Sequence, residues 1–211
     1  MRPYERDPAA IYAQSFATVR SEARLERFPP GMEPLVIRLI HACGMVDIAD
    51  RLAFSPDAAE AGQAALAQGA PILCDCEMVG AGIIRRTLKG NDVIVTLNEA
   101  GVPADAKALG TTRSAAAVEL WRPHLEGAVV AIGNAPTALF HLLEMIEAGA
   151  PRPAVILGFP VGFVGAAESK AELAANPRGC AFVTLRGRRG GSAMASAAVN
   201  ALTAGLNGGV A

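Results

Sequence analysis

The chain has 211 residues, of which 52% are hydrophobic and 18% charged, and its formal net charge is -1. This is the composition of a globular protein, since disordered chains combine low hydrophobicity with high charge. A nearly neutral chain has no global field that attracts nucleic acid or an anionic membrane, so we expect neither as a partner. We predict one domain over residues 1–211, because no stretch resembles a linker.

The first residues lack the apolar core of a signal peptide, and the most apolar stretch, residues 129–143, is interrupted by Gly133, Asn134 and Pro136. We therefore expect a cytoplasmic protein. Its four cysteines contain no C-x-x-C pair, and we expect buried or half-buried thiols. They are Cys43, Cys74, Cys76 and Cys180.

Helical patterns open the sequence, at about residues 9–25 and at residues 33–43, where Gly44 ends the second helix. Ser55-Pro56-Asp57 predicts the start of a third helix. A strand–loop–helix rhythm follows, with strands at 71–74, 93–97, 128–132, 154–157 and 181–185 and helices from 77, after 136, near 167 and after 192. Such alternation predicts a three-layer α/β/α sandwich with a mainly parallel sheet. We expect a frayed tail after about residue 205.

Gly-containing loops follow three of these strands, at residues 133–136, 158–162 and 187–191. Ligands of open parallel sheets bind beyond the carboxyl ends of the strands, where helix starts offer free amides to an anion. Tight strand-to-helix turns are the alternative interpretation. Since no loop matches a phosphate-binding or dinucleotide motif, we expect no nucleotide cofactor.

On the helix at 33–43, an apolar stripe (Val36, Leu39, Ile40, Cys43) leaves Arg38 and His41 one turn apart on the opposite side. The two side chains either face solvent or are presented together to a cleft. A guanidinium favours neutral imidazole and a bound carboxylate favours imidazolium, so His41 could change its protonation state in such a cleft.

The other titratable residues point to structure more than to chemistry. We expect structural roles for His124 and His141. Residues 74–77 (Cys-Asp-Cys-Glu) contain metal-ligating types, but no spaced His or second Cys pair accompanies them, so we expect no metal site.

Seven stretches, in order along almost the whole chain, resemble the precorrin-8X methylmutase (precorrin isomerase) family. They are IYAQSFATVR (11–20), VIRLIHACG (36–44), GAPILCDCEMV (69–79), TTRSAAAVELW (111–121), VVAIGNAPTALF (129–140), GFPVGFVGAAESK (158–170) and RGRRGGSAMASAAVNAL (186–202). The resemblance implies a flavodoxin-like fold, a homodimer, and a methyl shift from C-11 to C-12 of precorrin-8X that gives hydrogenobyrinate without cofactor or metal.

The resemblance also implies site residues: His41 as the catalytic acid/base, with Ser15 and Arg38 as substrate contacts. We hypothesise that His41 protonates the macrocycle and takes the proton back after the methyl group has moved. Because such a substrate carries several carboxylates, we assign Arg113, Arg188 and Arg189 to carboxylate binding.

Three alternatives stay open. The family has a second branch that acts on the cobalt-containing substrate, although residues around GFVGAAESK and GGSAMASAA resemble the metal-free branch. The protein could also be a non-catalytic corrinoid carrier, or a nucleotide-binding protein of flavodoxin type on fold analogy alone.

Overall fold

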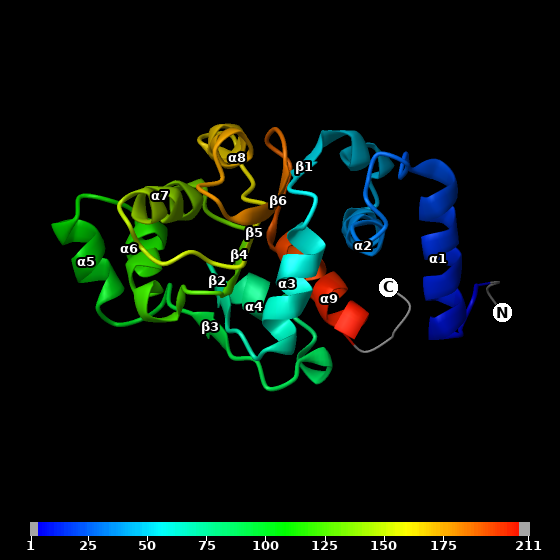
Figure 1. Cartoon of the computed structure of the whole chain (residues 1–211), viewed down its shortest axis with the longest axis horizontal. Helices are drawn as coiled ribbons and strands as arrows, with labels where there is room; N and C mark the ends of the chain where they lie inside the picture. Colours follow the sequence, from blue (N-terminus) through cyan, green and yellow to red (C-terminus); the bar gives the residue numbers. More distant parts are fainter. Residues whose placement is uncertain (1–3, 207–211) are drawn as a thin grey trace.

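A six-stranded sheet runs through the centre of the computed structural model, which describes residues 4–206 (Figure 1). Its strands are β1 (Leu52–Phe54), β2 (Ile72–Cys74), β3 (Val93–Val95), β4 (Val129–Ile132), β5 (Val155–Gly158) and β6 (Ala181–Leu185). They lie in the order β1-β6-β5-β4-β2-β3, with β1 antiparallel to β6 and every other pair parallel. The five parallel strands have the order of flavodoxin-like doubly wound sheets, which confirms the predicted fold class.

Helices cover both faces of this sheet. They are α1 (Pro8–Glu22), α2 (Glu33–Cys43), α3 (Ala58–Ala67), α4 (Glu77–Gly82), α5 (Val102–Ala108), α6 (Arg113–Glu119), α7 (Pro136–Glu147), α8 (Ala166–Ala175) and α9 (Ser192–Leu206), with short 3-10 helices η1 (Val46–Arg51), η2 (Arg85–Thr87) and η3 (Arg122–His124). Helix α2 has the predicted bounds, and Gly44 ends it with φ 68°, the left-handed conformation that favours glycine. None of the helices in the described residues is long and apolar enough to span a membrane.

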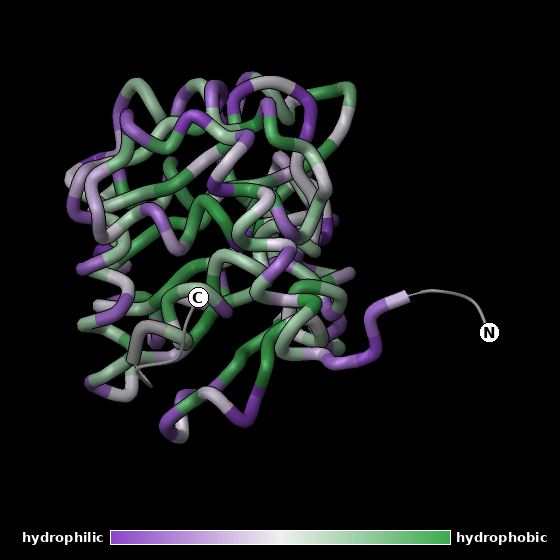
Figure 2. The backbone as a smooth tube through the Cα atoms, turned by 90° about the vertical axis from the view of Figure 1, so that its right-hand side faces the viewer, coloured by the Kyte–Doolittle hydropathy of each residue, from purple (hydrophilic) through white to green (hydrophobic). Residues whose placement is uncertain are grey.

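Two hydrophobic cores lie on the two faces of the sheet. Along β4, Val129 and Ala131 pack into the core beneath α2, α3 and α9, whereas Val130 and Ile132 pack into the core beneath α7. Successive strand side chains point to opposite faces, so a strand buried on both sides is apolar throughout. Figure 2 shows the result, with hydrophobic inner segments and hydrophilic outer loops. The predicted three-layer sandwich is thus confirmed.

One strand and two α-helices of the described residues were not predicted. Strand β1 has only three residues and is a strand because Leu52 pairs with Leu185 of β6. Helices α5 and α6 have seven residues each and enclose a small satellite core around Val102. The frayed tail expected after residue 205 lies outside the described residues beyond Leu206, and the single domain over 1–211 stays a prediction.

Helix α1 lies at one end of the molecule against α2, while α5 and α6 lie at the other end (Figure 1). Asp7 caps α1 by accepting from the Ala9 amide at 3.0 Å. Among the residues of α1, Phe16 and Val19 are buried. The helix is therefore an outer wall fixed mainly by the face of α2 that carries Arg38 and His41.

Candidate functional site

His41 faces α1 and is half-buried there. Its Nδ1 lies 2.8 Å from the Ser15 hydroxyl oxygen. The rings of Tyr12 and Phe16 flank the imidazole, each with its centroid 5.3 Å away. The structure therefore favours the interpretation that His41 is presented to a cleft, and the contact with Ser15 leaves Nε2 as the ring nitrogen for proton transfer.

Arg38 adds a poorly solvated positive charge to this cleft. Within residues 4–206 its buried Nε has no hydrogen-bond partner, and the guanidinium carbon lies 5.8 Å from the centroid of the Phe16 ring. Burial lowers the pKa of Arg38, and burial together with the Arg38 charge lowers the pKa of His41. A half-buried cation whose Nε has no partner among the described residues is well placed to bind a carboxylate.

Two neighbouring cavities, of about 570 Å³ and 370 Å³, share Tyr12, Arg38, Ile84 and Asn200 in their linings. The larger is walled by α1 and by residues 84–87, and the smaller reaches His41. Arg20 and Arg86 line the larger one among mostly apolar side chains. Their sizes are those of small-molecule sites, and the lining suits a bulky apolar ligand that carries carboxylates.

Sequence reasoning missed Tyr12, Arg86 and Asn200 as lining residues. Tyr12 had a usable signal, because it precedes Ser15 by three positions and therefore shares its side of α1. Arg86 and Asn200 had none, since they reach the cavity only through the packing of residues 82–87 on α9.

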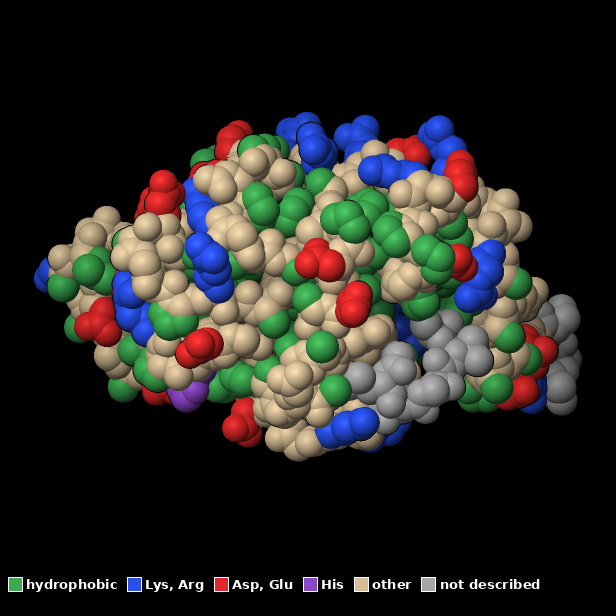
Figure 3. Space-filling model, in the orientation of Figure 1, with side chains coloured by type: hydrophobic (Ala, Val, Ile, Leu, Met, Phe, Trp, Pro, Cys, Tyr) green, Lys and Arg blue, Asp and Glu red, His purple; other side chains and the backbone are tan. Residues whose placement is uncertain are grey.

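The predicted arginines outside α2 lie elsewhere. Arg189 forms a bidentate ion pair with Asp47, which raises the pKa of Arg189. The guanidinium carbon of Arg188 lies 5.4 Å from the centroid of the Phe163 ring. Arg113 donates to Leu97 and Asn98 at the start of α6, at the other end of the sheet. Figure 3 shows Lys and Arg side chains along the upper edge of the molecule. The structure thus brings Ser15, Arg38 and His41 together, but not Arg113 or Arg188.

The crevice between β2 and β4, where the strand order reverses, is already filled. Asp75 is 4% exposed, and its carboxylate accepts the amides of Gly133, Asn134 and Ala135 at 2.8–2.9 Å. Burial raises the pKa of Asp75, and the three amides act in the opposite direction. The loop at 133–136 therefore presents its amides to the protein's own carboxylate, which disfavours the nucleotide-binding alternative.

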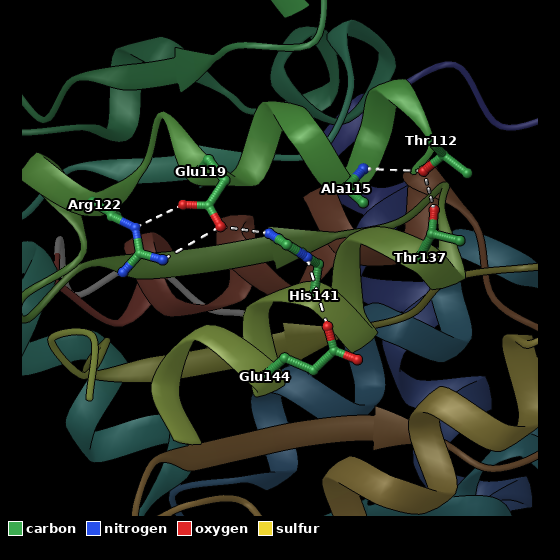
Figure 4. Close-up of polar contacts among 7 residues, drawn as sticks. All are labelled: Thr112, Ala115, Glu119, Arg122, Thr137, His141 and Glu144. Atoms are coloured by element: carbon green, nitrogen blue, oxygen red, sulfur yellow. Dashed lines mark hydrogen bonds and ion pairs between the residues drawn. The ribbon is translucent and has the colours of Figure 1, made fainter. Parts of the chain in front are cut away.

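His141 has a structural environment, as predicted (Figure 4). Its Nε2 lies 2.7 Å from Glu119 and its Nδ1 lies 3.7 Å from Glu144, so it joins α6 to α7. Arg122 holds the same Glu119 carboxylate. In residues 4–206 no three His, Cys, Asp or Glu side chains gather as metal ligands would. Cys43 is half-buried and the other three thiols are buried, as predicted.

Comparisons with known proteins agree on one family. The sequence model of the precorrin-8X methylmutase family matches residues 10–204. A precorrin-8X methylmutase of Pseudomonas aeruginosa is 66% identical, covering 96% of this chain and 98% of that protein. A cobalt-precorrin-8 methylmutase of Priestia megaterium is 35% identical, covering 96% and 90%. A crystal structure of the precorrin-8X methylmutase of Thermus thermophilus superposes with a TM-score of 0.85 at 40% identity, covering 96% of this chain and 98% of that one. The chain belongs to the precorrin-8X methylmutase family of isomerases.

Proposed function

We propose that this protein moves a methyl group from C-11 to C-12 of precorrin-8X and so forms hydrogenobyrinate, in the cytoplasm. The observation that carries the proposal is the cleft in which Ser15, Arg38 and His41 meet beside two cavities of ligand size. Identity is 66% and 57% with two relatives named for precorrin-8X, against 35% with one named for cobalt-precorrin-8, which favours the metal-free substrate. The free thiols fit a reducing compartment.

In this mechanism His41 starts as neutral imidazole, because burial and Arg38 lower its pKa. A polycarboxylate substrate brings negative charge that favours the imidazolium form, and a carboxylate on Arg38 removes the opposing positive field. As the substrate binds, His41 takes up a proton from solvent, and it then donates this proton to the macrocycle. The bond from C-11 to the methyl group breaks, and the bond to C-12 forms. The proton returns to His41, so the reaction is a net isomerisation. Ser15 holds the ring through Nδ1 and directs Nε2 to the substrate.

We further propose that Arg189, which contacts Met45 just after the end of α2, binds a peripheral carboxylate of the substrate. Substrate binding by Arg113 and Arg188, which lie away from the cleft, stays a prediction. Arg189 would then exchange Asp47 for a substrate carboxylate. We also propose a homodimer, supported by Phe163 and Val164, which are 87% and 89% exposed beside Arg188. Apolar side chains exposed together to this extent commonly mark an interface.

The test is absorbance spectroscopy of wild type and His41→Ala, each mixed with precorrin-8X and, separately, with hydrogenobyrinate. We expect wild type to convert the precursor and the variant to bind it without turnover. A variant that retains most of the wild-type turnover would contradict the role of His41. Wild type that binds hydrogenobyrinate but converts nothing would favour the carrier, and turnover restricted to the cobalt-containing precursor would favour the other branch.

A further inference from the structure

Helix α9 is mostly apolar, but after Ser192 at its start it carries a stripe of three polar side chains: Ser196, Asn200 and Thr203. Their spacing of four and three residues places them on one side of the helix. All three residues are buried, with exposures of 5%, 8% and 1%. A buried polar side chain costs free energy unless it is hydrogen-bonded, so this stripe must meet polar groups inside the protein.

Those groups belong to the segment of residues 82–87, which runs from the last residue of α4 to the end of η2. The Asn200 side-chain amide donates to the Gly82 carbonyl oxygen at 2.9 Å and accepts from the Ile84 amide at 2.8 Å. Asn200 therefore bonds main-chain groups on both sides of Ile83. Its side chain thus supplies one donor and one acceptor to the main chain of this segment, as a neighbouring strand does in a sheet.

The other two members of the stripe support the same contact. Thr203 Oγ1 lies 2.9 Å from Thr87 Oγ1. At Gly82 the two elements come so close that a Cβ would lie 2.4 Å from the Ser196 hydroxyl oxygen. The distance between α9 and residues 82–87 is thus set at both ends, with Asn200 in the middle.

Residues 82–87 are also a wall of the candidate site. Ile84, Arg86 and Thr87 line the larger cavity opposite α1, and Gly82 and Ile84 line the smaller cavity that contains His41. A displacement of this wall would change the width of both cavities and carry Arg86 with it. The side chain of Asn200, although it borders both cavities, is bonded through both its polar atoms to the wall.

We infer that Asn200 is a positioning residue, which holds the wall at residues 82–87 at the separation from α1 and α2 that the macrocycle requires. This inference rests on the proposed function. Misplacement of binding groups by about 1 Å can cost on the order of a hundredfold in activity, so the effect on ligand binding is measurable.

Asn200→Asp tests the inference, because it keeps the shape but places an acceptor oxygen against the Gly82 carbonyl. Asn91→Asp is the matched control: Asn91 is 6% exposed, its amide donates to the Leu66 and Ala70 carbonyls at 2.9 Å, and it lines neither cavity. We expect both variants to lower the thermal midpoint. We expect only Asn200→Asp to weaken hydrogenobyrinate binding and raise KM, by roughly ten- to a hundredfold, with a smaller change in kcat. Wild-type affinity in Asn200→Asp, or equal weakening in both variants, would overturn the inference.

A second set of variants moves the wall without changing Asn200 and without adding charge to the cavities. A loss of affinity in this set therefore cannot come from repulsion of the substrate's carboxylates. Gly82→Ala forces a methyl group against Ser196, and Ser196→Gly makes room for it. We expect Gly82→Ala to weaken hydrogenobyrinate binding and the double variant to regain most of the affinity, whereas an unaffected Gly82→Ala would contradict positioning. Wild type is the reference in each assay. If wild type neither binds hydrogenobyrinate nor converts precorrin-8X, the proposed function fails, whereas failure of positioning alone leaves wild-type turnover intact.

Discussion

Lys170 of α8 is fully buried, and its lowered pKa should make the free energy of unfolding depend on pH. Its ammonium donates to the Arg189 carbonyl oxygen, and burial lowers the pKa of Lys170 from 10.5 to about 8. Between these two values the unfolded chain holds a proton that the folded chain has lost, so the free energy of unfolding rises with pH. At about 1.4 kcal/mol per pKa unit, the whole interval corresponds to roughly 3 kcal/mol.

The assay is urea unfolding of wild type and Lys170→Met across this pH range. Other titrating groups cancel in the difference between the two proteins, because Met does not titrate. The quantity compared is the free energy of unfolding of wild type minus that of Lys170→Met. We expect this difference to increase by roughly 2 kcal/mol between about pH 8 and about pH 10. Lys107→Met, at an exposed position, should show no such trend. A difference that stays flat or falls with pH would refute the reasoning, because the folded-state pKa of Lys170 would then not be depressed.

Two further predictions concern the loops at the carboxyl ends of the strands. Asp75→Asn replaces one acceptor oxygen with a donor that cannot bond the amides at residues 133–135, and we expect a loss of roughly 2–4 kcal/mol in the free energy of unfolding, measured with denaturant. A loss well below that range would mean that water or loop movement satisfies the amides. Asp47→Ala releases the Arg189 guanidinium, so we expect tighter hydrogenobyrinate binding in that variant and weaker binding in Arg189→Ala, by titration calorimetry. Unchanged affinity in both would remove Arg189 from the substrate contacts.

Helix α2 was predictable to the residue because its signals are local. Pro34 lies in its first turn and Gly44 takes the left-handed conformation at its end. The apolar stripe between them is buried except at Cys43, which is half-buried. The same periodicity placed Arg38 and His41 on a shared side. The contact of His41 with Ser15 spans 26 positions, and only the family resemblance could pair them in advance.

The arginine-rich loop shows why other site residues could not be predicted. A Gly- and Arg-rich turn after a strand has the same sequence whether its cations are free or paired. The carboxylate that binds Arg189 lies 142 positions away, at Asp47, and no local pattern connects them. Similarly, Asn200 is one of a few polar residues on a mostly apolar helix, and its hydrogen-bond partner, the Ile84 amide, lies 116 positions earlier in the chain.

The candidate site lies between α1 and α2, outside the crevice in which such parallel sheets usually bind their ligands. In a doubly wound sheet of this strand order the ligand usually lies where the order reverses, but Asp75 fills that crevice here. Helices α1 and α2, which precede the first parallel strand, supply a second location, because α2 packs on α9 and α1 packs on α2. Helix α1 buries few of its residues, so its loss would open the cleft around His41 while the two cores of the sheet persist. We therefore expect ligand affinity to be more sensitive than global stability to substitutions at the contact between α1 and α2.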